Sequence, residues 1–268
     1  MSKWTIVKTM AAATAAASLA TAASAQTRGV TATEVLFGMP TDLSGVAATY
    51  GVSSSNGVKM RFDEVNEQGG IEGRKLKVIV EDQAYQVPKA VQACNKLINR
   101  DKVFAFVGPL GTPMNNACFK DQFAVGVPNL FPLSAARSMY EPYERLKFYG
   151  AASYVDQIRA GIQYFVKNKG VKTVCVMYQD TDFGKEILEG AKEQADKLGI
   201  KIAETTAHKP TDQDFTAPIT KLREAKCELI ALGTIESRHH RARFDRALHG
   251  GAQDGLDRRR LPRLGRGL

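Results

Sequence analysis

Glycine-rich and polar stretches directly follow several apolar runs, and these stretches hold the residues that could do chemistry. The clearest is 108–112, which follows the apolar run 103–107 and ends in Thr112. The run reads as a buried strand, and the residues after Thr112 read as a helix. We expect Thr112 to be the N-cap of this helix. We also expect the turn to offer free backbone N–H groups to a carboxylate or carbonyl oxygen.

Three further loops occupy the same position after an apolar run. Residues 43–51 carry Ser44 and Tyr50, residues 133–135 are Leu-Ser-Ala, and residues 178–184 contain Phe183. In open parallel sheets ligands bind at the edge formed by the carboxyl ends of the strands. Small hydroxyls would hold a polar head group there, with Tyr50 and Phe183 as apolar walls. Each loop alone could be a plain strand-to-helix connection, but together they favour a binding site.

The motifs of common enzyme classes are missing from this chain. It has no G-x-S-x-G, H-E-x-x-H, G-x-x-x-x-G-K-[ST] or G-x-G-x-x-G segment. The single histidine before residue 237 is His208, in a polar loop where a solvated side chain is expected. We therefore expect no catalytic residue, no metal and no cofactor. An exported hydrolase is a disfavoured alternative, because no pair of nucleophile and base is visible.

Strand and helix patterns alternate through 26–236. Expected strands are 35–39, 76–80, 103–107, 128–131, 171–178, 200–206 and 229–232. Expected helices are 52–67, 88–100, 114–125, 156–169, 182–198 and 215–225. This alternation predicts an α/β fold with parallel sheets flanked by helices. The irregular stretch 132–152 predicts a boundary between a first lobe, 26–150, and a second lobe, 151–236.

Residues 1–25 have the pattern of a secretory signal peptide. Lys3 and Lys8 precede the Ala-rich apolar run 10–21, and Ala-Ser-Ala at 23–25 fits a cleavage site. The run is too short to span a bilayer, and no later apolar run is long enough. We expect export to the periplasm.

Residues 237–268 differ in composition from the rest of the chain. They hold nine Arg, five Gly and three Asp, with no Lys, Ile or Val. One interpretation is a disordered basic tail, and the favoured one is a translated frameshift that leaves the second lobe incomplete. Most of the net charge of +9 lies in this tail and in the signal peptide. Because 26–236 is nearly neutral, the charge does not indicate nucleic-acid binding.

The four cysteines lack metal-binding spacing. Cys94 and Cys118 lie on consecutive predicted helices, where either a disulfide or two free thiols is consistent with the sequence. Cys175 and Cys227 lie in or beside apolar runs, and we expect both to pack as small hydrophobic residues.

Several segments resemble a known family in order along 32–236. They are LSGVAATYG (43–51), VNEQGGIEGRK (65–75), ED (81–82), FVGPLGT (106–112), VP (127–128) and YQDTDFGK (178–185). This succession is similar to the periplasmic solute-binding proteins of branched-chain-amino-acid-type ABC transporters, the leucine-binding group of type I periplasmic binding proteins.

The resemblance implies two α/β lobes that close over a small ligand. It places Tyr50 against the ligand, Gly111 and Thr112 at its polar head, and Phe183 on the opposite lobe. The segment after the fourth strand would add backbone groups and a hydroxyl from Leu133, Ser134 and Ala135. In the family's amino-acid binders an acidic group later in the second lobe holds the ammonium, and that part would lie beyond residue 236.

The function that follows is an extracytoplasmic solute-binding component of an ABC importer. Its ligand would be an amino acid or a related carboxylate or amide, and its partner a membrane permease that it contacts transiently, with no nucleic acid. The alternative is a ligand-sensing receptor of the same fold.

Overall fold

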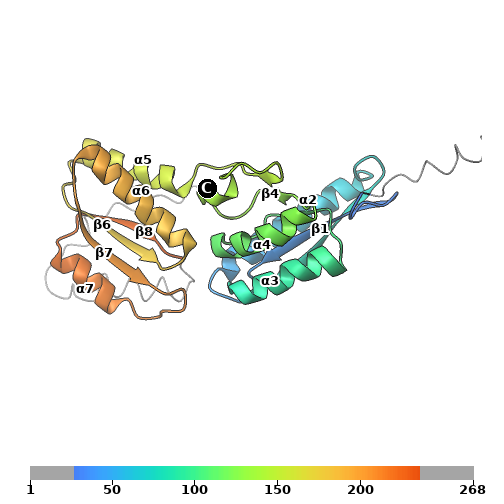
Figure 1. Ribbon diagram of the computed structural model, residues 1–268, viewed down its shortest axis with the longest axis horizontal. Coiled ribbons are helices and arrows are strands. Elements are labelled where there is room, and N and C mark those ends of the chain that lie inside the picture. The colour runs from blue at the N-terminus through green and yellow to red at the C-terminus, as the bar shows by residue number, and fades with distance from the viewer. Residues whose placement is uncertain (1–26, 236–268) are drawn as a thin grey trace, which may run out of the picture.

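The computed structural model describes residues 27–235, so the predicted signal peptide and the Arg-rich tail lie outside the described residues. The described chain forms two α/β lobes, each with a parallel sheet flanked by helices (Figure 1). This confirms the expected fold class. None of the helices in the described chain is both long and apolar enough to cross a membrane.

The first lobe contains a five-stranded sheet in the order β2-β1-β3-β4-β5. Its strands are β1 (Glu34–Thr41), β2 (Lys75–Asp82), β3 (Ala105–Val107), β4 (Asn129–Leu130) and β5 (Lys147–Phe148). Its helices are α2 (Ala48–Glu67), α3 (Val87–Asn95), which continues as the π-helical turn Lys96–Arg100, and α4 (Thr112–Ala124). A 3-10 turn, Arg137–Met139, follows β4.

The strand order of the first lobe creates a crevice. From β1 the chain crosses to β2 on one side, and from β2 it crosses back to β3 on the other side. Right-handed crossovers of opposite direction place their helices on opposite faces, so α2 covers one face while α3 and α4 cover the other (Figure 1). The loops after β1 and β3 therefore diverge at the carboxyl edge, where doubly wound sheets bind ligands.

The second lobe repeats this arrangement with three strands in the order β7-β6-β8. Its elements are α5 (Tyr154–Lys169), β6 (Val174–Gln179), α6 (Asp182–Leu198), β7 (Ile202–His208), α7 (Thr216–Glu224) and β8 (Leu229–Gly233). Helices α5 and α6 lie on one face and α7 on the other (Figure 1). From β6 the chain crosses to β7 on one side, and from β7 it crosses back to β8 on the other side.

Two expectations about the elements are wrong in detail. The strand expected at 103–107 begins only at Ala105, because the Val103 N–H bonds back to the Leu97 carbonyl at the end of the preceding helix (3.1 Å). It is nevertheless central in its sheet, paired with β1 and β4. The stretch 132–152 is not wholly irregular, since it contains β5. Two residues are too few to give an alternating pattern.

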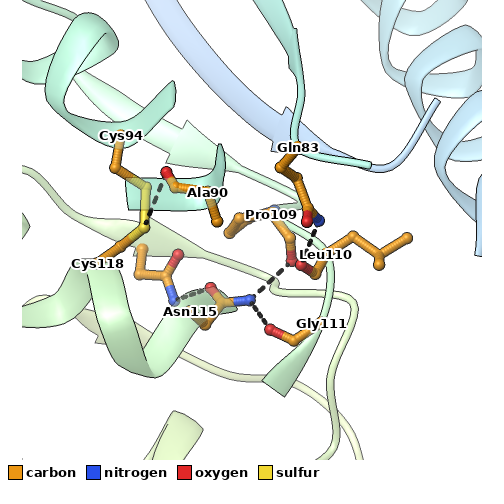
Figure 2. The surroundings of a disulfide bond; sticks show 9 residues. Gln83, Ala90, Cys94, Pro109, Leu110, Gly111, Asn115 and Cys118 are labelled. Carbon is orange, nitrogen blue, oxygen red and sulfur yellow. Dashed lines mark hydrogen bonds between the residues drawn. A yellow bond between two sulfur atoms is a disulfide. The ribbon is translucent and has the colours of Figure 1, made fainter. Parts of the chain in front are cut away.

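All four cysteines form disulfides. Cys94 and Cys118 join α3 to α4 (Figure 2), with Cα atoms 6.1 Å apart. Cys175 of β6 joins Cys227, two residues before β8, at 5.8 Å. The expectation that Cys175 and Cys227 remain unpaired is wrong. The disulfide forms because the strand order places the start of β8 beside β6, although β7 lies between them in the sequence.

The loop after β1 is organised by one buried carboxylate. Asp42 accepts backbone N–H groups from Ser44 (3.1 Å), Gly45 (2.5 Å) and Ala47 (2.7 Å). Ala47 is the N-cap of α2 and has no side-chain acceptor, so Asp42 takes the role of a capping residue. Helix α2 approaches Asp42 closely, since a Cβ on Gly51 would lie 1.8 Å from the Asp42 carbonyl oxygen.

We predict that each disulfide stabilises the native state by limiting the unfolded chain. The bridged residues are separated by 24 and 52 positions in the sequence. Loops of these lengths correspond to about 3 to 4 kcal/mol per bridge. Denaturant unfolding of the Cys94→Ala/Cys118→Ala and Cys175→Ala/Cys227→Ala variants measures this loss. Four free thiols in the unreduced native protein would contradict the pairing.

We predict that Asp42→Ala lowers the free energy of unfolding by about 2 kcal/mol, because three N–H groups lose a buried acceptor. Thermal or urea unfolding monitored by circular dichroism measures the change. Asp63→Ala is the matched control, since it removes an exposed carboxylate from helix α2, which follows the Asp42 loop. Equal effects of the two substitutions would show that Asp42 does not cap α2.

Candidate functional site

The carboxyl edges of the two sheets meet. Gln179, the last residue of β6, donates its side-chain amide to the hydroxyl of Tyr85, which follows β2 (3.4 Å). Asn116 of α4 donates to Asp182 at the start of α6 (2.9 Å). Ile235, just after β8, packs against a buried cluster of the first lobe that includes Tyr85. The loops that the sequence singled out therefore lie at the junction of the lobes.

Thr112 and Ser134 come together as a hydroxyl pair. Their Oγ1 and Oγ atoms are 2.7 Å apart, and both residues are buried. Thr112 is the first residue of α4, while Ser134 lies in the segment that follows β4. Burial raises the pKa of Tyr154, and hydrogen bonds with the Ala135 backbone and the Ser134 side chain oppose that rise. The phenol of Tyr154 thus adds a third hydroxyl from the second lobe.

Three N–H groups of the glycine turn form hydrogen bonds within the protein, although we expected them to be free. The N–H groups of Gly108, Leu110 and Gly111 donate to the carbonyls of Leu130 (2.9 Å), Pro40 (3.1 Å) and Leu133 (3.2 Å). These acceptors come from strands or loops distant in the sequence, so the turn in isolation gives no sign of them. These three N–H groups are therefore already used within the protein.

The carbonyls of the same turn are also used. The Asn115 side chain donates to the carbonyls of Pro109 (3.2 Å) and Gly111 (2.8 Å), and Gln83 donates to that of Leu110 (3.0 Å). Figure 2 shows these bonds beside the Cys94–Cys118 disulfide. Side chains of α4 and of the loop after β2 thus hold the turn in place.

Gly111, not Thr112, is the N-cap of α4, so that expectation is wrong. Its φ of 93° lies in the region that glycine adopts readily and a threonine does not. Tyr85 also packs here, since a Cβ on Gly111 would lie 3.3 Å from Tyr85 Cε2. As a consequence Thr112 lies in the first turn of the helix, with its hydroxyl directed to Ser134.

Aromatic side chains surround the hydroxyls. The ring of Phe183 meets that of Tyr154 edge to face, with centroids 4.9 Å apart. Tyr50 and Leu133 are more exposed, at 58% and 41%. Tyr50 also contributes to raising the pKa of Tyr154. Ala135 is buried, and its carbonyl accepts the Tyr154 N–H (2.7 Å).

Arg137 ties the segment after β4 to the second lobe. Its guanidinium donates to Glu189 (3.0 Å) and Glu193 (2.8 Å), and its backbone N–H donates to Glu186 (2.9 Å). The three glutamates lie along one side of α6. The hydrogen bond to Glu193 is the largest cause of the raised pKa of Arg137. This contact holds Ser134 and Ala135 close to α6.

Sequence reasoning missed Tyr85, Gln179, Tyr154 and Glu186. Tyr85 follows the predicted strand 76–80, so the rule that selected the other loops would also have found it. Tyr154 and Glu186 lie on helices, and only the meeting of the lobes shows that they adjoin Ser134. Among residues 27–235 no group of three or more His, Cys, Asp or Glu side chains is arranged to hold a metal ion.

Comparisons with known proteins identify relatives of this chain. A family model described as periplasmic binding protein matches residues 34–239. The amino acid binding protein of Pseudomonas aeruginosa is 24% identical over 202 residues, which are 75% of this chain and 54% of that protein. The Leu/Ile/Val-binding protein BraC3 of Rhizobium johnstonii is 26% identical, with the same coverage. The chain thus spans about half the length of these curated relatives.

Solved structures show the same fold. The fatty acid ABC transporter substrate-binding protein from Thermomonospora curvata has a TM-score of 0.76 and 27% identity, covering 85% of this chain and 56% of that one. LivJ of Streptococcus pneumoniae, solved in complex with isoleucine, has a TM-score of 0.63 and 26% identity, covering 71% of this chain and 54% of that one. The resemblance drawn from the sequence is confirmed. The family model matches well over half of the sequence, and the chain therefore belongs to the periplasmic binding proteins.

Proposed function

We propose that this chain is the extracytoplasmic solute-binding component of an ABC importer and binds a small organic solute between its lobes. One observation carries the proposal. The hydroxyls of Thr112 and Ser134 form a buried pair where the carboxyl edges of both sheets meet, with Tyr154 of the second lobe beside them. A solute held there contacts both lobes at once.

The hydroxyls suit an oxygen-bearing head group. Each of the three can rotate to donate a hydrogen bond to a carboxylate or carbonyl oxygen. Thr112 lies in the first turn of α4, where the partial positive charge of the helix end favours an anion. The proposed polar contacts are therefore the side chains of Thr112, Ser134 and Tyr154. Gly111 and Ala135 position them through the backbone.

Apolar side chains provide the remaining contacts. Phe183 already packs on Tyr154, whereas Tyr50 and Leu133 expose large apolar surfaces at the junction. A solute whose apolar part lies on Tyr50 and Leu133 removes that surface from water, which favours binding. These residues would select the size of the apolar part of the solute.

The relatives support a carboxylate ligand. Their names and titles mention amino acids in some cases and a fatty acid in another. These compounds share a carboxylate and differ in the presence of an amino group. The predicted signal peptide, 1–25, and the family description support a periplasmic location. A transient complex with a membrane permease follows from the importer role.

We predict that Thr112→Val weakens carboxylate binding about tenfold, because the substitution keeps the side-chain shape and removes one hydrogen-bond donor. Calorimetric titration of the full chain with the carboxylate that most raises its melting temperature measures the effect. Thr205→Val, at an exposed position of β7, is the matched control.

Two results would contradict the proposal. Unchanged affinity in Thr112→Val would remove this residue from the site. Failure of all amino acids, aliphatic carboxylates, aromatic carboxylates and fatty acids to raise the melting temperature of the folded chain would contradict the solute-binding function itself.

A further inference from the structure

Two ion pairs join the segment after β4 to the second lobe, and Arg137 makes both of them. Its Nη1 donates to Glu189 Oε1 (3.0 Å), and its Nη2 donates to Glu193 Oε1 (2.8 Å). Its backbone N–H donates to Glu186 Oε1 (2.9 Å). Each carboxylate receives a separate donor, so this one residue is attached to α6 at three points.

The three glutamates are spaced to meet a single partner. They occupy positions i, i+3 and i+7 of α6, which lie along one side of a helix over about two turns. Arg137 begins the 3-10 turn Arg137–Met139, after which the chain returns to the first sheet as β5. Both ion pairs therefore run from the first lobe to the second.

The guanidinium of Arg137 belongs to a network of charges. Its side chain is 28% exposed, against 51% for Glu189 and 35% for Glu193. Arg159 of α5 contacts the other carboxylate oxygen of Glu193 (3.4 Å), so this carboxylate lies between two guanidinium groups. A partly buried guanidinium that donates to two carboxylates is held more firmly than an isolated surface pair.

These ion pairs lie close to the hydroxyls proposed to bind the solute but do not include them. Arg137 follows Ser134 by three residues. Thr112 and Ser134 are 2% and 5% exposed, so a solute reaches them only when the surrounding segments separate. Moving the segment after β4 away from α6 would break both ion pairs.

We propose that Arg137 is a positioning residue that holds the two lobes in the arrangement of this structure and slows their separation. Its ion pairs form only while α6 lies against the segment after β4, so they stabilise this arrangement and not a separated one. A solute between the lobes leaves after they separate. The effect on the solute rests on the proposed function, whereas the effect on the lobes does not.

Distances between spin labels test the positioning role on the full chain without any solute. Labels carried by unnatural amino acids at exposed Lys59 of α2 and Lys221 of α7 leave both disulfides intact. Arg137→Gln keeps the backbone N–H donor and removes the guanidinium. We expect the population with longer interlobe distances to rise about three- to tenfold, as two partly exposed ion pairs would produce. Double electron–electron resonance measures it, and an unchanged distribution would overturn the proposal.

Arg159→Gln is the matched control. It removes a guanidinium that contacts Glu193 and Asp156, but both of these partners belong to the second lobe. We expect the interlobe distances to stay unchanged in this variant. Equal changes in Arg137→Gln and Arg159→Gln would show that the distances respond to any loss of positive charge beside α6, which would contradict a specific role for Arg137.

Glu189→Gln gives a second test at a more exposed position. If the two single substitutions remove the same interaction, the double variant Arg137→Gln/Glu189→Gln should open no further than Arg137→Gln alone. Strictly additive effects would contradict the pairing. Circular dichroism establishes that each variant is folded.

Release of the solute tests the consequence for binding. We expect Arg137→Gln to raise the dissociation rate of the carboxylate that most raises the melting temperature by about three- to tenfold. Raising NaCl from about 0.05 to about 0.5 M should speed release from the unsubstituted chain more than from Arg137→Gln, because salt screens these ion pairs. Stopped-flow fluorescence or surface plasmon resonance measures the rate.

The outcomes separate the two proposals. An unchanged dissociation rate in folded Arg137→Gln would overturn this inference and leave solute binding intact. Absence of binding by every carboxylate would refute the proposed function, and the interlobe distances would still decide the positioning role of Arg137.

Discussion

Parallel strand pairing is the constraint on which the rest of the structure depends. Because every strand in each sheet runs in one direction, all the loops that follow strands emerge at a single edge. The order β2-β1-β3-β4-β5 then opens a crevice at that edge of the first lobe. The junction of the two edges brings Thr112 and Ser134 from the first lobe close to Tyr154 from the second. The disulfide between α3 and α4 and the carboxylate of Asp42 hold the loops that form this junction.

The fold and half of the candidate site could be predicted from local sequence. Apolar runs gave the strands, and the position of Thr112 and Ser134 after such runs placed both at one edge. We expected free N–H groups in the glycine turn. Local sequence could not show that three of them are hydrogen-bonded, because the acceptors Pro40, Leu130 and Leu133 come from other segments. The Cys175–Cys227 bridge depends on strand order in the same way. These features are set by pairing between distant parts of the chain, which periodicity does not encode.

The contribution of the second lobe was the least predictable. Phe183 was identified because it follows a strand, whereas Tyr154 and Glu186 occupy helical positions with no distinctive spacing. Arg137, in the segment after β4, donates hydrogen bonds to the glutamates of α6 and so links this segment to the second lobe. In physical terms the proposed contribution of the hydroxyls is to donate hydrogen bonds to an oxygen-bearing head group.

The central claim is that the solute binds where the carboxyl edges of the two lobes meet. A crystal structure of the full chain grown with L-leucine, or with the carboxylate that most raises its melting temperature, tests it most directly. The account predicts ligand density at the junction, with carboxylate oxygens about 3 Å from Thr112 Oγ1 and Ser134 Oγ. Ligand bound elsewhere, with the two hydroxyls still paired to each other, would contradict it.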